Sequence, residues 1–452
     1  MTLMTRVTTA VAIVAVVLGC PKPAPVASEA SGSSDPKALA TEVTKLADAG
    51  DSIGIGTKLQ AACADPATRE ACLQAQLVPL ASSGRVKLAM GALGKLASLD
   101  PNIQTDGHVY AHAIGIAAGQ STGDVAGAFT QCSESFQSGC YHGVIQAWFG
   151  RLDSVGQKEI NDLCQPFRTD ESQRWIRFQC VHGMGHGLTM LYKHDLRDGL
   201  KGCDLLSDAW DRHACYGGAF MENIVNVTNP HHPAAALAHD HDATSATAAK
   251  GDAADEHAGH DMAAMTDAKP KFKAVDPKDQ LYPCSILGEQ YQSACYGMQT
   301  SVMLYNNGGN MADAAKACDA APKNMRSTCY ASLGRDISSY AHQNHAEAIR
   351  MCSLGSKLCQ PWCFLGVVKN LIDLNARASD GLAFCRSVPG DGNKQLCYAA
   401  VGEQVLVLTP DNEQRRKMCA DSEPAYLVAC QYGASVNREL PDGLGKVYRS
   451  IE

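Results

Sequence analysis

The chain has 452 residues, of which 45% are hydrophobic, and a formal net charge of −8. The hydrophobic content excludes a chain that is disordered throughout, and the negative charge argues against nucleic acid as a partner, because phosphate binding needs a basic face. Twenty cysteines are far more than a reduced cytosol favours, so we expect an oxidising compartment.

The N-terminal segment has the pattern of a secretion signal. Arg6 precedes an apolar run, "VTTAVAIVAVVL", that ends in "VLGC" at Cys20 and is too short to span a bilayer. The stretch resembles the lipobox of bacterial lipoproteins, which implies a signal peptide over residues 1–19, acylation of Cys20 and a lipid anchor in the cell envelope. Pro21 after the cysteine favours the outer membrane within that resemblance. Residues 20–36 predict a flexible tether, and the alternative is an ordinary signal peptide with an incidental cysteine.

The remaining nineteen cysteines form nine local pairs and leave Cys359 over. The pairs are Cys63 with Cys72, Cys132 with Cys140, Cys164 with Cys180, Cys203 with Cys215, Cys284 with Cys295, Cys318 with Cys329, Cys352 with Cys363, Cys385 with Cys397, and Cys419 with Cys430. In the C-terminal half the second members recur every 34, 34, 34 and 33 residues. This period suits one helix–turn–helix unit and predicts an all-α solenoid. A disulfide within each pair would contribute roughly 2–3 kcal/mol by joining the two helices, and Cys359 would be free or would exchange for Cys352.

The same period extends through residues 37–227, with one repeat that lacks both cysteines. The step from Cys72 to Cys140 is two periods, so the second-cysteine position of the missing pair falls at Asp106. Residues 276–452 form the C-terminal repeats, which have no specialised residues in this pattern. The period resembles tetratricopeptide repeats and the paired cysteines resemble Sel1-like repeat proteins, which implies a concave face that binds a protein partner.

Histidines recur at fixed distances from the second cysteine position. Counted from Asp106, Cys140 and Cys180, three of them lie at +2 and two lie at +6, one helical turn further on (His108, His142 and His182; His112 and His186). Residues four apart share a helix face, so we expect five imidazoles on one face of three adjacent helices. Glycine at +3, as at Gly143 and Gly183, indicates that these helices approach closely.

Paired histidines on one helix and a third on its neighbour are typical ligands of zinc or copper. The pair in "HGMGH" has the spacing of the "HExxH" metalloproteases but lacks their glutamate, which excludes that family. A structural alternative is a ladder of half-buried histidines that bond to the preceding loop. Acidic or basic groups near the pattern are candidates for acid–base or supporting roles: Glu134, Asp195, His213 and Glu222.

A His-rich insert occupies residues 228–275 and should be disordered, because it is rich in alanine and aspartate and has no hydrophobic periodicity. Its candidate ligands are His231, His232, His239, His241, His257, His260 and Met262. The segment "HAGHDMAAM" resembles the Met/His-rich segments of periplasmic copper- and silver-handling proteins, and imidazole with thioether suits copper. A low-complexity loop that binds metal adventitiously is the alternative.

The sequence therefore predicts an envelope-anchored lipoprotein that binds a transition metal, copper or zinc, through its histidine cluster and its insert. Two other functions stay open at this point. One is a protein-interaction scaffold in which the histidines are structural, and the other is a metal-dependent enzyme that uses the same face.

Overall fold

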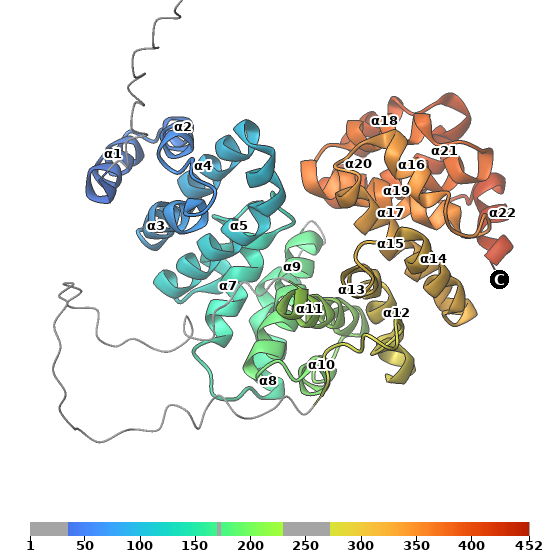
Figure 1. Cartoon of the computed structure of the whole chain (residues 1–452), viewed down its shortest axis with the longest axis horizontal. Coiled ribbons are helices and arrows are strands. Elements are labelled where there is room, and N and C mark those ends of the chain that lie inside the picture. Colours follow the sequence, from blue (N-terminus) through green and yellow to red (C-terminus); the bar gives the residue numbers. More distant parts are fainter. Residues whose placement is uncertain (1–34, 170–172, 229–271, 452) are drawn as a thin grey trace, which may run out of the picture.

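The computed structural model describes residues 35–169, 173–228 and 272–451. The described part is all-helical, without strands, and is arranged as stacked helical hairpins (Figure 1). This arrangement confirms the predicted helical repeat solenoid. Cys20 and the seven insert ligands named above lie outside the described residues. No described helix is both long and apolar enough to cross a bilayer.

Each hairpin has an inner helix, which contains the second cysteine position and faces the middle of the array. The inner helices are α3 (Arg69–Ser82), α5 (Pro101–Thr122), α7 (Gly139–Phe149), α9 (Arg174–Leu191), α11 (Ala209–Thr228), the pair α12 (Glu289–Tyr296) and α13 (Gln299–Asn306), α15 (Arg326–Tyr340), α17 (Gln360–Asn375), α19 (Asp391–Leu408) and α21 (Leu427–Gly433). Successive inner helices pack directly against one another, as α5, α7, α9 and α11 do.

The outer helices cover these inner ones. They are α2 (Ser52–Ala62), α4 (Val86–Leu99), α6 (Val125–Phe129), α8 (Gln157–Leu163), α10 (Leu196–Asp204), α14 (Met311–Ala320), α16 (His345–Cys352), α18 (Ala378–Ser387) and α20 (Asn412–Ala420), with α1 (Pro36–Asp48) and α22 (Asp442–Ile451) at the two ends. Several begin at an Asp or Asn whose side chain accepts from a backbone N–H of the first turn, as Asn310 and Asp411 do. Such a cap stabilises a short helix by about 1 kcal/mol.

Nine disulfides join the two sides of a hairpin, with Cα–Cα distances from 5.5 to 5.9 Å. In the N-terminal half Cys63 bonds to Cys72, Cys132 to Cys140, Cys164 to Cys180, and Cys203 to Cys215. In the C-terminal half Cys284 bonds to Cys295, Cys318 to Cys329, Cys352 to Cys363, Cys385 to Cys397, and Cys419 to Cys430. Cys359 is buried and free, so the exchange with Cys352 is not seen. The local pairing inferred from the period is thus confirmed throughout.

Glycines let neighbouring inner helices touch backbone to backbone. Between α9 and α11, a Cβ on Gly185 would overlap the carbonyl oxygen of Cys215, and a Cβ on Gly218 would overlap that of His182. The same reciprocal pair recurs in the C-terminal half, where Gly334 meets Cys363 and Gly366 meets Ala331, and where Gly402 meets Cys430 and Gly433 meets Ala399. Glycine at +3 therefore marks close helix approach, as predicted.

The glycine contacts correct the register of the repeat that lacks cysteines. Between α5 and α7 the pair is Gly115 against Cys140 and Gly143 against the carbonyl of His112. By comparison with the other repeats, the second-cysteine position falls at Tyr110, four residues after Asp106. His112, His142 and His182 are consequently the equivalent histidines, each two residues after the second-cysteine position. His108 lies one helical turn before His112, and His186 lies one turn after His182.

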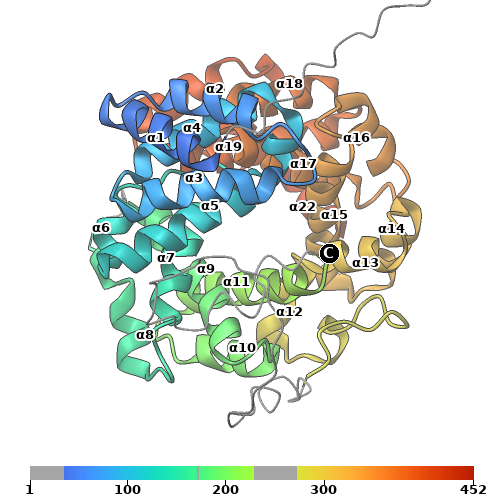
Figure 2. The same cartoon turned by 60° about the vertical axis from the view of Figure 1, so that its left-hand side comes forward.

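The array curls until its two halves face each other (Figures 1 and 2), with α5 and α7 opposite α17 and α19. Nε2 of Gln137, before α7, donates to Oδ1 of Asn370 on α17 across this gap, at 3.5 Å. The curl brings residues more than two hundred positions apart to a common central space.

The edges of the predicted insert are better ordered than expected. Helix α11 continues to Thr228, and Phe272 is buried with the guanidinium carbon of Arg197 4.7 Å from its ring centroid. Asn223 donates to the carbonyl of Ala274 at 3.1 Å. The prediction that residues 272–275 lack packed structure is therefore wrong.

Candidate histidine site in the central cavity

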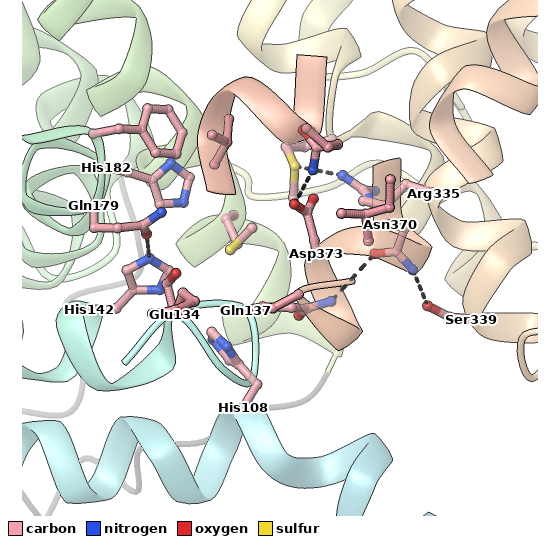
Figure 3. Close-up of a pocket in the computed structure, with 18 of the residues that line it drawn as sticks. His108, Glu134, Gln137, His142, Gln179, His182, Arg335, Ser339, Asn370 and Asp373 are labelled. Atoms are coloured by element: carbon pink, nitrogen blue, oxygen red, sulfur yellow. Dashed lines mark hydrogen bonds between the residues drawn. The ribbon is translucent and has the colours of Figure 1, made fainter. Parts of the chain in front are cut away.

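A cavity of about 540 Å³ lies inside the curl and is lined by the inner helices. His108, His142 and His182 are on one wall, from α5, α7 and α9 (Figure 3). Asn370 and Asp373 of α17 are on the opposite wall. A volume of this size is typical of small-molecule sites, which usually measure about 300–1,000 Å³.

All five predicted histidines form one cluster centred on His142. Its ring centroid is 5.1 Å from that of His182, 5.0 Å from that of His186, 5.6 Å from that of His108 and 6.5 Å from that of His112. His182 and His186 are 5.2 Å apart, so three rings form a nearly equilateral triangle. The α5 histidines also adjoin the α9 histidines, because the ring centroids of His112 and His186 are 6.5 Å apart. The two pairs therefore belong to one cluster and not to two separate groups.

Two polar side chains orient the central imidazoles from behind. Nδ1 of His186 lies 2.9 Å from Oε2 of Glu222, and Nε2 of His142 lies 3.1 Å from Oε1 of Gln179. Both partners accept, so these ring nitrogens carry the protons, which places the lone pairs on Nε2 of His186 and Nδ1 of His142. Nδ1 of His142 is buried and has no hydrogen-bond partner among the described residues.

Burial disfavours the charged form of three histidines of the cluster, His108, His142 and His182. Desolvation, with repulsion from the neighbouring imidazoles, lowers the pKa of His142 well below its usual range. Desolvation and His186 lower the pKa of His182 to about 3. The Ala214 carbonyl opposes this decrease in the pKa of His182 without completing a hydrogen bond to Nδ1. Neutral imidazole is the form that binds metals.

The spacing of the rings fits a shared metal ion, but the ring nitrogens do not point to a common centre in this structure. Three imidazoles with metal–nitrogen distances of about 2.0–2.1 Å around a tetrahedral ion have ring centroids about 5 Å apart, which matches His142, His182 and His186. No group of three or more His, Cys, Asp or Glu side chains within the described ranges is arranged, as it stands, to hold a metal ion. Binding would thus require the rings to turn about their side-chain torsions.

The other predicted polar residues separate into two groups. Glu222 joins the cluster and is also 3.7 Å from Nδ1 of the half-buried His194, and Glu134 lines the cavity. Asp195 instead caps α10 by accepting from the N–H of Asp198, and His213 is not among the residues that line the cavity. Glu222 and Glu134 therefore lie at the candidate site, whereas Asp195 and His213 lie outside it.

The C-terminal wall was missed by the sequence pattern, which has no histidine there. Arg335 and Asp336 of α15 line the cavity with Asn370 and Asp373 of α17 and Gln404 of α19. Asp336, Asn370 and Gln404 each lie seven residues after the second cysteine of their hairpin, the offset that Glu222 has from Cys215. Their residue types differ, and no histidine drew attention to this repeat position. The prediction that the C-terminal half is unspecialised is wrong for its concave face.

A strained turn carries part of the cavity wall. Phe136, Gln137 and Ser138 have consecutive φ values of 56°, 52° and 62°, a left-handed conformation that side-chain-bearing residues avoid. Nδ1 of His108 lies 2.9 Å from the Phe136 carbonyl oxygen and helps to hold the turn. Such strain concentrates at functional sites, and here it directs Gln137 across the gap to Asn370.

Comparison with protein-family models, with curated protein sequences and with solved structures finds no match to the chain.

Proposed function

We propose that this chain is an envelope-anchored lipoprotein that binds a transition metal ion, copper or zinc, in its central cavity. The observation that carries the proposal is the triangle of buried imidazoles at His142, His182 and His186, with centroids 5.0–5.2 Å apart. The sequence pattern at Cys20 supports the anchor, and nine disulfides support an oxidising compartment.

The proposed ligands are His142 through Nδ1, His186 through Nε2, and His182. Glu222 behind His186 has the position of the carboxylates that orient metal-bound histidines and raise their basicity. Gln179 has the same orienting role for His142. Because the pKa values of His142 and His182 are lowered, these imidazoles need lose no proton before binding at neutral pH.

The α5 pair, His108 and His112, would contribute a second, weaker position on the same face. The insert histidines and Met262 would add loosely held ions, with copper favoured by the thioether. Nitrogen-only ligands at the central triangle suit both Zn²⁺ and copper, so the metal at that position is proposed as one of these two.

Elemental analysis of the untagged protein after purification tests the proposal. His186→Ala should remove the tightly bound ion while the helical content stays nearly unchanged, because disulfides rather than the ion hold the two sides of each hairpin together. The matched control is His342→Asn, at an exposed histidine of the C-terminal half whose positive φ asparagine tolerates.

The same experiment separates the proposal from a scaffold with structural histidines. Under either function His186→Ala loses its buried bond to Glu222, which destabilises the fold by about 1–3 kcal/mol, so metal content and not stability distinguishes the two. For a scaffold, metal content would be the same, near zero, in the variant and the wild type. A concave face that only grips a protein partner would give this result.

A metal-dependent enzyme is the second candidate, and the cavity beside the imidazoles favours it. Three protein ligands leave a position on a tetrahedral ion for water or substrate, as in catalytic zinc sites. Azide or cyanide binding to the metal-loaded protein would reveal such an open position. A metal that is saturated by protein ligands would bind neither anion.

A further inference from the structure

The one cationic side chain among the described residues that line the cavity is already neutralised. Arg335 donates from Nε to Oδ1 of Asp336 at 2.9 Å. It also donates from Nη1 to the Gly297 carbonyl at 2.9 Å and from Nη2 to Ser301 at 2.7 Å. Its donors are therefore used within the wall, and they leave Arg335 unsuited to hold an anionic ligand.

Two carboxylates that line the cavity, Glu134 and Asp373, form no ion pair with the described residues. The nearby Lys369 pairs with Glu403 instead. Gln404 donates a hydrogen bond to Asp373, but a neutral amide does not compensate the charge of the carboxylate. The pKa values of the three histidines that line the cavity are lowered, so these imidazoles do not supply the missing positive charge.

The two carboxylates lie on different walls. Figure 3 shows Glu134 beside His142 and Asp373 on the facing helix α17, with Gln137 between the two walls. They are not part of any group arranged to chelate a metal ion in the described structure. A single ion at one point would thus satisfy one carboxylate, whereas a molecule with separated positive groups can satisfy both.

Apolar and aromatic side chains make up much of the remaining lining. Trp175 and Phe178 of α9 are stacked with centroids 5.8 Å apart, and both face the cavity with Met221 and Met298. Aromatic faces attract organic cations, and methylene chains pack on apolar walls.

We propose that the central cavity binds a small organic polycation, an aliphatic molecule with two or more amino groups, which pairs with Asp373 on one wall and Glu134 on the other. The methylene chain lies against the aromatic and methionine side chains between them. This site does not depend on the proposed metal site, because the carboxylates belong to a different part of the wall from the triangle of imidazoles.

The ionisation of Asp373 agrees with a missing counter-ion. Asp373 is exposed on the cavity wall. The helices packed around it nevertheless desolvate the carboxylate and raise its pKa to about 6, and Lys369 and Gln404 offset only part of this rise. The groups that face it are Gln404 from α19, Lys369 from its own helix and the Arg335–Asp336 pair from α15. A bound ammonium would stabilise the carboxylate and lower this pKa.

Calorimetric titration of the full-length protein with spermidine tests the proposal. The comparison ligands are adipate, a dianion, and 1,6-hexanediol, which is uncharged. Spermidine should bind, while the other two should not bind measurably. Asp373→Asn and Glu134→Gln should each weaken spermidine binding at least tenfold, while Glu413→Gln on the outer helix α20, far from the cavity, should change nothing.

Titrations run in parallel with metal-free and zinc-loaded protein separate this site from the metal site. Spermidine should bind the metal-free protein, and the His186→Ala variant should retain this binding. The proposal is overturned if adipate binds as well as spermidine, or if both carboxylate variants keep wild-type affinity while circular dichroism reports an intact fold. Neither result would bear on metal content.

Discussion

Replacing Gly218 with alanine should force helices α9 and α11 apart at the histidine cluster. The new Cβ would overlap the His182 carbonyl oxygen and lie 2.9 Å from its carbonyl carbon and 3.3 Å from Cα of Gly185. Carbon atoms in contact prefer about 3.5–4.0 Å, so the contact with the carbonyl carbon alone requires the backbones to separate by about 0.6–1 Å, and the overlap with the oxygen requires more. No side chain can rotate to relieve this overlap, and we expect a loss near the upper end of the overpacking range, about 3 kcal/mol.

Two control variants separate this effect from the intrinsic effect of alanine in a helix. At Gly402 a Cβ would also lie 2.9 Å from a carbonyl carbon, that of Cys430, far from the histidines. At Gly94, exposed on α4, nothing lies within 4 Å, so alanine should stabilise the helix by about 0.5–1 kcal/mol.

Urea unfolding with the disulfides intact measures all three variants, and a competitive zinc titration reports on the site. Gly218→Ala should lose both stability and metal affinity, because the overlap displaces His182 itself. Gly402→Ala should lose stability alone, and Gly94→Ala should lose neither. Equal stability of Gly218→Ala and the wild type would refute the backbone-to-backbone packing that sets the spacing of the histidines.

Further outcomes follow from the same geometry. Glu222→Gln should weaken metal binding about 10–100-fold in a competitive titration without unfolding the array, and unchanged affinity would remove its orienting role. Cys359 should resist a thiol reagent in the folded protein, because it is 2% exposed and burial raises its pKa, and rapid labelling under native conditions would contradict its placement. Spermidine affinity should fall as the pH is lowered through about 6, since protonation removes the charge of Asp373; an affinity that is constant from pH 7.5 to 5 would exclude this carboxylate.

The solenoid and its disulfides could be predicted because every element of that pattern is local. Each cysteine pair closes a short loop within one hairpin, so spacing alone identifies both partners and the period of the array. The repeat that lacks cysteines has no such marker. A slip of one helical turn from Asp106 to Tyr110 left the two-period distance from Cys72 to Cys140 unchanged and altered only how it divides. The close contacts of Gly115 and Gly143 were the signal that could have fixed it.

The histidine cluster could be predicted only in part. Helical spacing placed His182 and His186 on one face, and proximity in sequence pointed to Glu222. Gln179 was not foreseen, because a residue one position before a cysteine has no distinguishing feature. The facing wall was not foreseen either, since the curl that brings Asp373 opposite His142 depends on small rotations summed over many repeats, which the period does not record.

Metal stoichiometry of the full-length chain tests the central claim most directly. The six insert histidines are first replaced with alanine, so that any retained ion reports on the cavity, and the untagged protein is analysed for zinc and copper beside its His142→Ala and His186→Ala derivatives. We predict about one tightly held ion per chain in the parent and none in either derivative, all three with the same helical content. An intact fold with no bound metal and no micromolar affinity for zinc or copper would contradict the account.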